Sequence, residues 1–310
     1  MKKYVCAIGG INIDIKGVSS GLSADSHPGK IFITEGGVAR NISENLSRLG
    51  IDVFLFGCIG KDGFGKRILD SADKSGMHTE NLIVSDKVNT AMYLSVSGSN
   101  GKLNYAVNDM KDSVNLIDVS YIKKHIDFIT KSSLVVTDAN VNINVLNFII
   151  DEANKKGIPV FLDAVSSDKG SNVNEIKGFI DYLSVNTSEF KSIFGFAPGA
   201  ASKEKISVKH FGKIIVRKGK NGSELYDADN GKKLKCKPIP ADVTEPNGAG
   251  DAFNAGFIYS VLNNNSIGDS LEFGTCASYF ALKSELTVSV DITKKKLDKL
   301  FRESKNIIEQ

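Results

Sequence analysis

Short apolar runs alternate along most of the chain with longer stretches in which apolar residues recur at helical spacing. The runs are nearly continuous in apolar residues, which is typical of strands in a parallel sheet that is covered on both faces. This order predicts an α/β fold with a doubly wound, mostly parallel sheet and helices on both faces. The expected strands are 4–9, 53–59, 133–139, 158–164, 181–185 and 213–219, and the expected helices are 39–50, 64–76, 142–157 and 252–265, with Gly50, Gly76 and Gly157 as C-terminal caps.

Two stretches interrupt this alternation, at about 11–35 and 88–110. Both are typical of exposed strands and turns, and the second contains a candidate hairpin around Ser99-Asn100-Gly101. Because both lie between core elements, we expect them to form one small β-sheet, a lid over the ends of the main strands. We expect a single domain over 1–310, and a homodimer formed where the exposed lid edges of two chains pair.

Charge and residue usage exclude several classes of protein. The 310 residues carry a net charge of only +3, without a basic stripe, so nucleic acid is not an expected partner. No apolar run reaches the ~18 residues of a membrane span and no signal peptide is visible, so we expect no membrane association. The scattered histidines argue against a zinc site, and the unpaired spacing of the four cysteines favours reduced thiols in a cytoplasmic protein.

The segment NGAGDAFNAG, residues 247–256, carries the strongest chemical signal. Gly248, Ala249 and Gly250 allow backbone N–H groups to approach an anion, and the helix that follows directs its positive end to the same place. Such a turn stabilises a transferring phosphoryl group, and Asp251 could accept the proton of an attacking hydroxyl. The alternative is that Asp251 is an ordinary helix N-cap and the glycines only shape a turn.

A second glycine-rich segment, GKDGFGKR at 60–67, nearly matches the phosphate-binding P-loop pattern. Arg67 takes the place of the Ser or Thr of that pattern, so no hydroxyl is available for Mg²⁺. We interpret the segment as a turn into a surface helix.

Two further motifs suit ligand binding. Gly36 and Gly37 open a helical pattern with Asn41 one turn in, which fits a polyhydroxylated ligand because an amide both donates and accepts; the alternative is a surface Asn at a helix start. Asn186 and Glu189 stand three apart at a strand-to-helix junction and could hold Mg²⁺ through its waters. The alternative for this pair is a helix capping box.

Together these segments resemble the PfkB-type, or ribokinase-like, carbohydrate kinases. GGVARNISENLSRLG with the GKDGFG that follows resembles the first signature of that family, and NGAGDAFNAG resembles the second. NTSE resembles the family's N-x-x-E motif, and RKGKNG at 217–222 resembles its nucleotide-side glycine turn. The motifs span nearly the whole chain in the family's order.

The resemblance implies a kinase that uses ATP and Mg²⁺ and adopts the ribokinase-like fold. ATP would bind beside 216–222 and 273–279, and Mg²⁺ near Asn186 and Glu189. Asp251 would be the catalytic base at an anion hole, facing a small nucleoside or sugar. The implied anion-hole residues are Gly248, Ala249 and Gly250, the acceptor residues Asn12, Asp14, Gly36, Gly37 and Asn41, and the nucleotide residues Asn186, Lys218, Gly219, Gly222 and Thr275.

Within the family, the segments at 12–17, 24–31, 36–46, 107–110 and 137–140 look most like pseudouridine kinases. Ribokinases would have a Glu near position 140, where this chain has Asn140. A neutral amide can pair with a uracil edge or a sugar hydroxyl, so Asn108 and Asn140 are candidate acceptor contacts. The resemblance therefore implies phosphorylation of the 5′-hydroxyl of pseudouridine.

The chain departs from the family pattern at one functional position, and two alternative functions stay open. Glu245-Pro246-Asn247 replaces the family's usual Asp-Thr-Thr, whose first residue helps to hold a monovalent cation, so activation by K⁺ is doubtful. The nearest alternative is another kinase of the family, such as a ribokinase, another nucleoside kinase or a fructokinase. A non-catalytic nucleoside-binding regulator on the same fold is the other, although the presence of Asp251, Asn186 and Glu189 argues against it.

Overall fold

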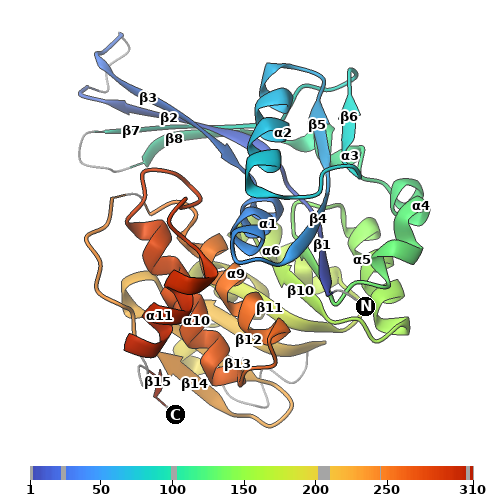
Figure 1. Cartoon of the computed structure of the whole chain (residues 1–310), viewed down its shortest axis with the longest axis vertical. Coiled ribbons are helices and arrows are strands. Elements are labelled where there is room, and N and C mark those ends of the chain that lie inside the picture. Colours follow the sequence, from blue (N-terminus) through green and yellow to red (C-terminus); the bar gives the residue numbers. More distant parts are fainter. Residues whose placement is uncertain are drawn as a thin grey trace.

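A nine-stranded sheet forms the centre of the protein in the computed structural model, which describes residues 3–21, 26–98, 103–201, 210–244, 246–304 and 308–309 (Figure 1). Six neighbouring strands run parallel and three more extend one edge antiparallel. In spatial order they are β4 (Asp52–Phe56), β1 (Tyr4–Ile8), β9 (Leu134–Asp138), β10 (Val160–Asp163), β11 (Ile180–Asn186), β12 (Phe211–Arg217), β13 (Ser223–Asp227), β14 (Lys233–Cys236) and β15 (Ile308–Glu309).

Helices cover both faces of this sheet, as expected for a doubly wound fold. Alternate residues of β1 belong to two separate cores: Cys6 and Ile8 to one, Val5 and Ala7 to the other. The first core includes α4 (Val119–Ile129), α5 (Ile143–Lys155) and α7 (Thr187–Phe194). Two short helices, α3 (Lys111–Asn115) and α6 (Ser167–Gly170), precede α4 and α7 in the chain. The second includes α1 (Val38–Arg48), α2 (Gly63–Ser75), α9 (Ala249–Leu262), α10 (Ile267–Leu282) and α11 (Lys294–Glu303). Within the described part of the chain, no helix combines the length and hydropathy that crossing a membrane requires.

Two expected boundaries are wrong in an informative way. The strand expected at 53–59 is interrupted at Gly57, and its second half, β5 (Cys58–Gly60), pairs with β6 (Ile83–Ser85) in a separate sheet. A Cβ on Gly57 would lie 2.5 Å from Cδ1 of Ile11, so the glycine leaves room for that side chain. The helix expected from residue 252 begins at Ala249, which makes the small residues before Asp251 the first turn of the helix itself.

The two interrupting stretches form the predicted small sheet, which projects from one end of the main body (Figure 1). Its central pair, β2 and β7, is parallel, and each outer strand pairs antiparallel with its neighbour. The candidate turn at 99–101 lies outside the described residues. The order of the lid strands is β3 (Gly29–Gly36), β2 (Asn12–Ser19), β7 (Met92–Gly98) and β8 (Leu103–Asp109).

The strand register separates the lid into an inner and an outer face. Successive residues of a strand point to opposite faces, so residues in one cross-strand row share a face. The row Thr34, Asp14, Tyr93 and Asn108 faces a cavity that all four residues line. Two alternate rows carry an apolar outer face made of Ile15, Ile31, Ile33, Leu94, Val96, Tyr105 and Val107, with Gly17 between Ile31 and Val96.

Close packing of α9 against α10 positions the start of α9 at the end of the sheet. Gly256 of α9 faces α10, and a Cβ there would lie 2.5 Å from the backbone oxygen of Phe273. The glycine therefore lets the two helices approach closely. Most of α9 is buried, so its N-terminal residues have a well-defined place.

Candidate active site

Asp251 is the third residue of α9 and lies at its N-terminus. The N-cap is Gly248 in the left-handed conformation, with φ of 78°, and no side chain caps the helix. The alternative that Asp251 is an ordinary N-cap is therefore wrong. The first N–H groups of a helix have no partner within it and attract anions. Glu245, on which the expectation about K⁺ rests, lies outside the described residues.

Both glycines of this segment are required by close contacts. A Cβ on Gly248 would lie 2.0 Å from the backbone oxygen of Thr287, in addition to the positive φ. A Cβ on Gly250 would lie 2.7 Å from Nη1 of Arg217. The absence of a side chain at 250 thus lets a guanidinium pack directly against the first turn of α9.

Two cavities meet at Asp251. The lid cavity, of about 660 Å³, lies under the inner face of the lid, and the main-sheet cavity, of about 810 Å³, lies on the other side. Gly248 and Asp251 line both, whereas Ala249 and Gly250 line the main-sheet cavity. The predicted acceptor residues that line the lid cavity are Asn12, Asp14, Gly37, Asn41, Asn108 and Asn140.

Gly36 supports this wall of the lid cavity. A Cβ on Gly36 would lie 2.3 Å from Oδ2 of Asp14, so the glycine allows that carboxylate to sit close to the backbone. Oδ1 of Asp14 accepts a hydrogen bond of 2.7 Å from Nδ2 of Asn12. Burial raises the pKa of Asp14, against the opposing effect of that bond.

The surroundings of Asp251 suit a general base. Nδ2 of Asn41 donates to its Oδ2 at 2.8 Å, and because Asn41 is buried, the alternative of a surface Asn is wrong. Burial and the neighbouring Asp163 raise the pKa of Asp251 to about 8, while Asn41 and Arg217 lower it. A base is most effective when its pKa lies near the operating pH.

A charged cluster that the sequence patterns did not indicate borders the main-sheet cavity. Arg217, at the end of β12, places Nη1 3.0 Å from Oδ2 of Asp163 and Nη2 3.6 Å from Oε2 of Glu189. Asn254 of α9 also donates to Oδ2 of Asp163, at 2.8 Å. The signal available in the sequence was the position of Arg217 as the first residue of the RKGKNG motif.

Asn186 and Glu189 form a capping box at the start of α7. The backbone N–H of Asn186 donates to Oε2 of Glu189 at 2.7 Å, and its side chain accepts from the N–H of Glu189 at 2.9 Å. Asn186 Nδ2 also donates to Oε1 of Glu189 at 2.6 Å. The capping alternative thus describes the geometry. Among the described residues, no cluster of three or more acidic, histidine or cysteine side chains could ligate a metal.

The predicted nucleotide residues divide into two groups. Gly219, Gly222 and Thr275 line the main-sheet cavity together with Asn186. Gly222 has φ of 79°, and a Cβ there would lie 2.0 Å from the backbone oxygen of Cys236. Lys218 instead forms an ion pair of 2.9 Å with Glu224, and the neighbouring Lys220 lines the cavity.

Asn140 has a cationic partner that the sequence patterns did not indicate. Nζ of Lys169, from α6, donates to Oδ1 of Asn140, and both side chains line the lid cavity. The buried carboxylate of Asp138 accepts from the backbone N–H groups of Gly10 and Asn140, both at 2.9 Å. Asn140 is therefore fixed from its backbone and from its side chain.

The rejected P-loop segment has the expected structure of a turn into a helix. Asp62 caps α2 by accepting from the N–H of Gly65 at 2.8 Å. Arg67 forms an ion pair of 2.7 Å with Glu35 of the lid strand β3. The segment thus supports the lid.

Comparison with known proteins agrees with this geometry. The chain matches the pfkB family of carbohydrate kinases over residues 2–293. It is 33% identical over 300 residues to pseudouridine kinase of Escherichia coli, covering 94% of each chain. Among solved structures, a carbohydrate kinase from Agrobacterium tumefaciens superimposes with a TM-score of 0.84 at 23% identity, over 100% of this chain and 99% of the other. Arabidopsis thaliana ribokinase, complexed with ribose and ATP, has a TM-score of 0.79 at 20% identity, covering 97% and 99%.

The match spans both cavities, the lid and Asp251. Kinases of this family transfer a phosphoryl group from ATP to a hydroxyl group, typically with Mg²⁺. The fold is accordingly ribokinase-like, as the sequence motifs predicted. The chain belongs to the pfkB family of carbohydrate kinases.

Proposed function

We propose that the protein is a pseudouridine kinase that transfers the γ-phosphoryl group of ATP to the 5′-hydroxyl of pseudouridine. The observation that carries this proposal is the meeting of the two cavities at Asp251. In the lid cavity, several amides and two lysines, Lys16 and Lys169, face the space for the acceptor. A uracil ring presents carbonyl oxygens that such donors recognise. The similarity to the E. coli pseudouridine kinase supports the same substrate.

Asp251 acts as the general base in this reaction. It accepts the proton of the acceptor hydroxyl while that oxygen bonds to the γ-phosphorus and the bond to the ADP oxygen breaks. The first-turn N–H groups of α9 and the guanidinium of Arg217 stabilise the negative charge of the transferring group. The lid covers the acceptor and keeps out water, which would otherwise compete as a nucleophile.

The nucleotide binds in the main-sheet cavity, with its phosphates toward the start of α9. Magnesium keeps several waters when it binds with phosphates, and when bound it reduces the repulsion between phosphate oxygens and the incoming hydroxyl. Glu189 and Asn186 fit such an ion only through its waters, because both oxygens of Glu189 already accept hydrogen bonds from Asn186.

The first experiment is ADP release from Mg·ATP with pseudouridine, uridine, adenosine, ribose and fructose as parallel acceptors. Turnover on pseudouridine far above the others supports the proposal. Strong turnover on ribose, another nucleoside or fructose would keep the kinase and discard the substrate. If no acceptor is turned over but nucleosides bind, the protein is a binding regulator on this fold.

Lys169 allows a more specific test of how the uracil ring would be recognised. Its ammonium donates one hydrogen bond to Asn140 and has two further N–H donors for a uracil carbonyl. Lys169→Met should raise the KM for pseudouridine roughly 10-fold or more, the effect of losing one charged hydrogen bond. The KM for ATP should stay unchanged, and an equal rise in both would contradict recognition by Lys169.

We also propose a homodimer formed through the lids. The outer face exposes apolar side chains to an unusual degree, with 75% of Ile31 and 74% of Tyr105 accessible. Contiguous exposed apolar surface on a lid strand favours contact with a second copy, through the face as well as the edge. A monomeric mass at micromolar concentration, measured by light scattering, would remove the dimer.

A reducing, cytoplasmic location fits the cysteines. Cys6, Cys58, Cys236 and Cys276 are all free and buried. Burial raises the pKa of each thiol, so they behave as inert packing residues. Fractionation of cells that express the protein would test the location.

A further inference from the structure

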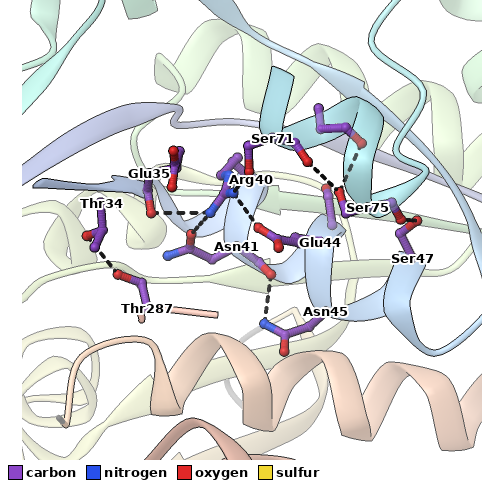
Figure 2. A network of polar contacts seen from close by, with 12 residues as sticks. Thr34, Glu35, Arg40, Asn41, Glu44, Asn45, Ser47, Ser71, Ser75 and Thr287 are labelled. Carbon is purple, nitrogen blue, oxygen red and sulfur yellow. Dashed lines mark hydrogen bonds and ion pairs between the residues drawn. The ribbon is translucent and has the colours of Figure 1, made fainter. Parts of the chain in front are cut away.

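Arg40 is a buried guanidinium that lies one residue from Asn41 and has no role in the mechanism above. Only 2% of the residue is accessible, although arginine is almost never so buried unless it is paired. Figure 2 shows it at the centre of a polar network between α1, α2 and the lid strand β3. It donates to Oδ1 of Asn41 at 3.0 Å, to the backbone oxygen of Glu35 at 3.2 Å, to Oγ of Ser71 at 3.0 Å, and to Glu44.

The bond to Asn41 determines which way that amide faces. A guanidinium can only donate hydrogen bonds, so the atom of Asn41 that faces Arg40 must be the oxygen. The amide nitrogen then faces Asp251 and donates to Oδ2 at 2.8 Å. Without Arg40, the amide could rotate and present its oxygen to the carboxylate, which would repel it.

We propose that Arg40 is a positioning residue for the phosphoryl-transfer step, acting on Asp251 through the amide of Asn41. With Oδ2 of Asp251 held by Asn41, Oδ1 is left for the acceptor hydroxyl. This inference rests on the proposed role of Asp251 as the base. Arg40 itself contacts neither cavity, so a direct contact with substrate does not explain its burial.

The same guanidinium connects this arrangement to the lid. It holds the backbone of Glu35 at the end of β3, next to Thr34, whose hydroxyl lies 3.1 Å from that of Thr287 (Figure 2). The backbone oxygen of Thr287 in turn packs against Gly248, the N-cap of α9. The base of β3 is thus bonded on both sides to groups that position Asp251, and we infer that lid position and base position are set together.

The fold offers a matched control for this residue. Glu44 receives Arg40 on one oxygen and Arg48 on the other, where Nη2 of Arg48 lies 2.7 Å away. Removing Arg40 therefore leaves Glu44 with a cation. Arg48→Gln removes the other cation that pairs with Glu44, and Arg48 does not contact Asn41. This variant therefore measures how much turnover is lost when the pairing of Glu44 alone is weakened.

The experiment compares Arg40→Gln with Arg48→Gln in the full chain, using the best acceptor found. Arg40→Gln should lower kcat about 10- to 100-fold, the size expected when a reacting group is misplaced, and should leave the KM for ATP within about twofold of the wild-type value. Arg48→Gln should keep kcat. If Arg40→Gln does not fold, Arg40→Lys takes its place, because one ammonium keeps the charge beside Glu44 but cannot reach all four acceptors.

A double-mutant cycle with Asn41→Ala decides the route. If Arg40 acts through Asn41, Arg40→Gln should cost less than about threefold in kcat once Asn41 is removed. The same large loss in the Asn41→Ala background, or equal losses for Arg40→Gln and Arg48→Gln, would overturn the proposal. Asp251→Asn distinguishes a failure of the base assignment from a failure of the role of Arg40. If Asp251→Asn keeps wild-type turnover, the base assignment itself is wrong. If Asp251→Asn is inactive but Arg40→Gln is fully active, only the role of Arg40 is refuted.

Discussion

The two cavities that meet at Asp251 are built in different ways. The lid cavity takes side chains from all four lid strands, and amides make up much of its polar lining. The main-sheet cavity is lined, among the described residues, by none of the lid strands. Three of its charged side chains are already paired, because Arg217 contacts both Asp163 and Glu189. For the proposed reaction, we infer from this difference that the phosphoryl side is organised before substrate binds, whereas the acceptor side depends on the position of the lid.

Asp251 belongs to both cavities, so its removal should have the largest effect. Asp251→Asn should lower turnover roughly 10²- to 10⁴-fold, because the acceptor hydroxyl loses its base. ADP release with saturating substrates measures this. Asp269→Asn, which changes a half-buried acid in the first turn of the neighbouring helix α10, is the control and should keep full turnover. Ordinary turnover in Asp251→Asn would remove the mechanism.

Arg217 tests the side that is organised in advance. Arg217→Gln should lower kcat/KM for ATP about 100-fold, the usual cost of losing one electrostatic stabiliser of the transition state, and should change the KM of the acceptor little. Lys213→Gln on the same strand removes a cation that pairs with Asp229 at the far end, and it should be nearly neutral. A loss confined to the acceptor KM would contradict the division between the cavities.

The pH dependence should show the electrostatic balance around Asp251. Its pKa is raised to about 8, so the base form is lost as the pH falls through that value. The kcat/KM for the acceptor should therefore rise about tenfold per pH unit below 8 and level off above it. In Arg217→Gln the midpoint should move to higher pH, since Arg217 lowers this pKa. A flat profile between pH 6 and 8 would contradict the raised pKa, provided that the unfolding temperature is constant over that range.

Local patterns predicted most of the main sheet. The six expected parallel strands are present, and Gly50, Gly76 and Gly157 all have positive φ at helix ends, because a strand's apolar run and a helix's last glycine depend on neighbours in sequence. The helix α10 was missed for the opposite reason. Its residues are buried on most sides, so it lacks the polar face that reveals a helix by periodicity.

The site was predictable only where it rests on sequence neighbours. The glycines and Asp251 stand in one turn, and the capping box joins residues three apart. Arg217 could not be found in this way, since its partners lie on other elements. Arg40 bonds to the adjacent Asn41, but that bond gains significance only because Asn41 reaches Asp251 on another helix. Arg217 of β12 contacts Asp163 of β10, which lies 54 positions earlier in the chain and is separated from β12 in the sheet by the single strand β11.

A substitution on the lid should have the smallest effect on activity, and that effect should be confined to the acceptor. Tyr105→Asp places a charge on the apolar outer face, 74% exposed and away from the lid cavity. If two lids pair through this face, the variant should become monomeric, and the less firmly held lid should raise the KM of the acceptor a few-fold. The KM for ATP should not change, because the main-sheet cavity contains no lid residue among those described.

Val84→Asp is the control. It puts the same charge on a residue 49% exposed in the small sheet of β5 and β6, and it should change neither the mass of the particle nor either KM. Equal changes in both KM values for Tyr105→Asp would show that the position of the lid also affects nucleotide binding. That result would contradict the division of labour between the two cavities.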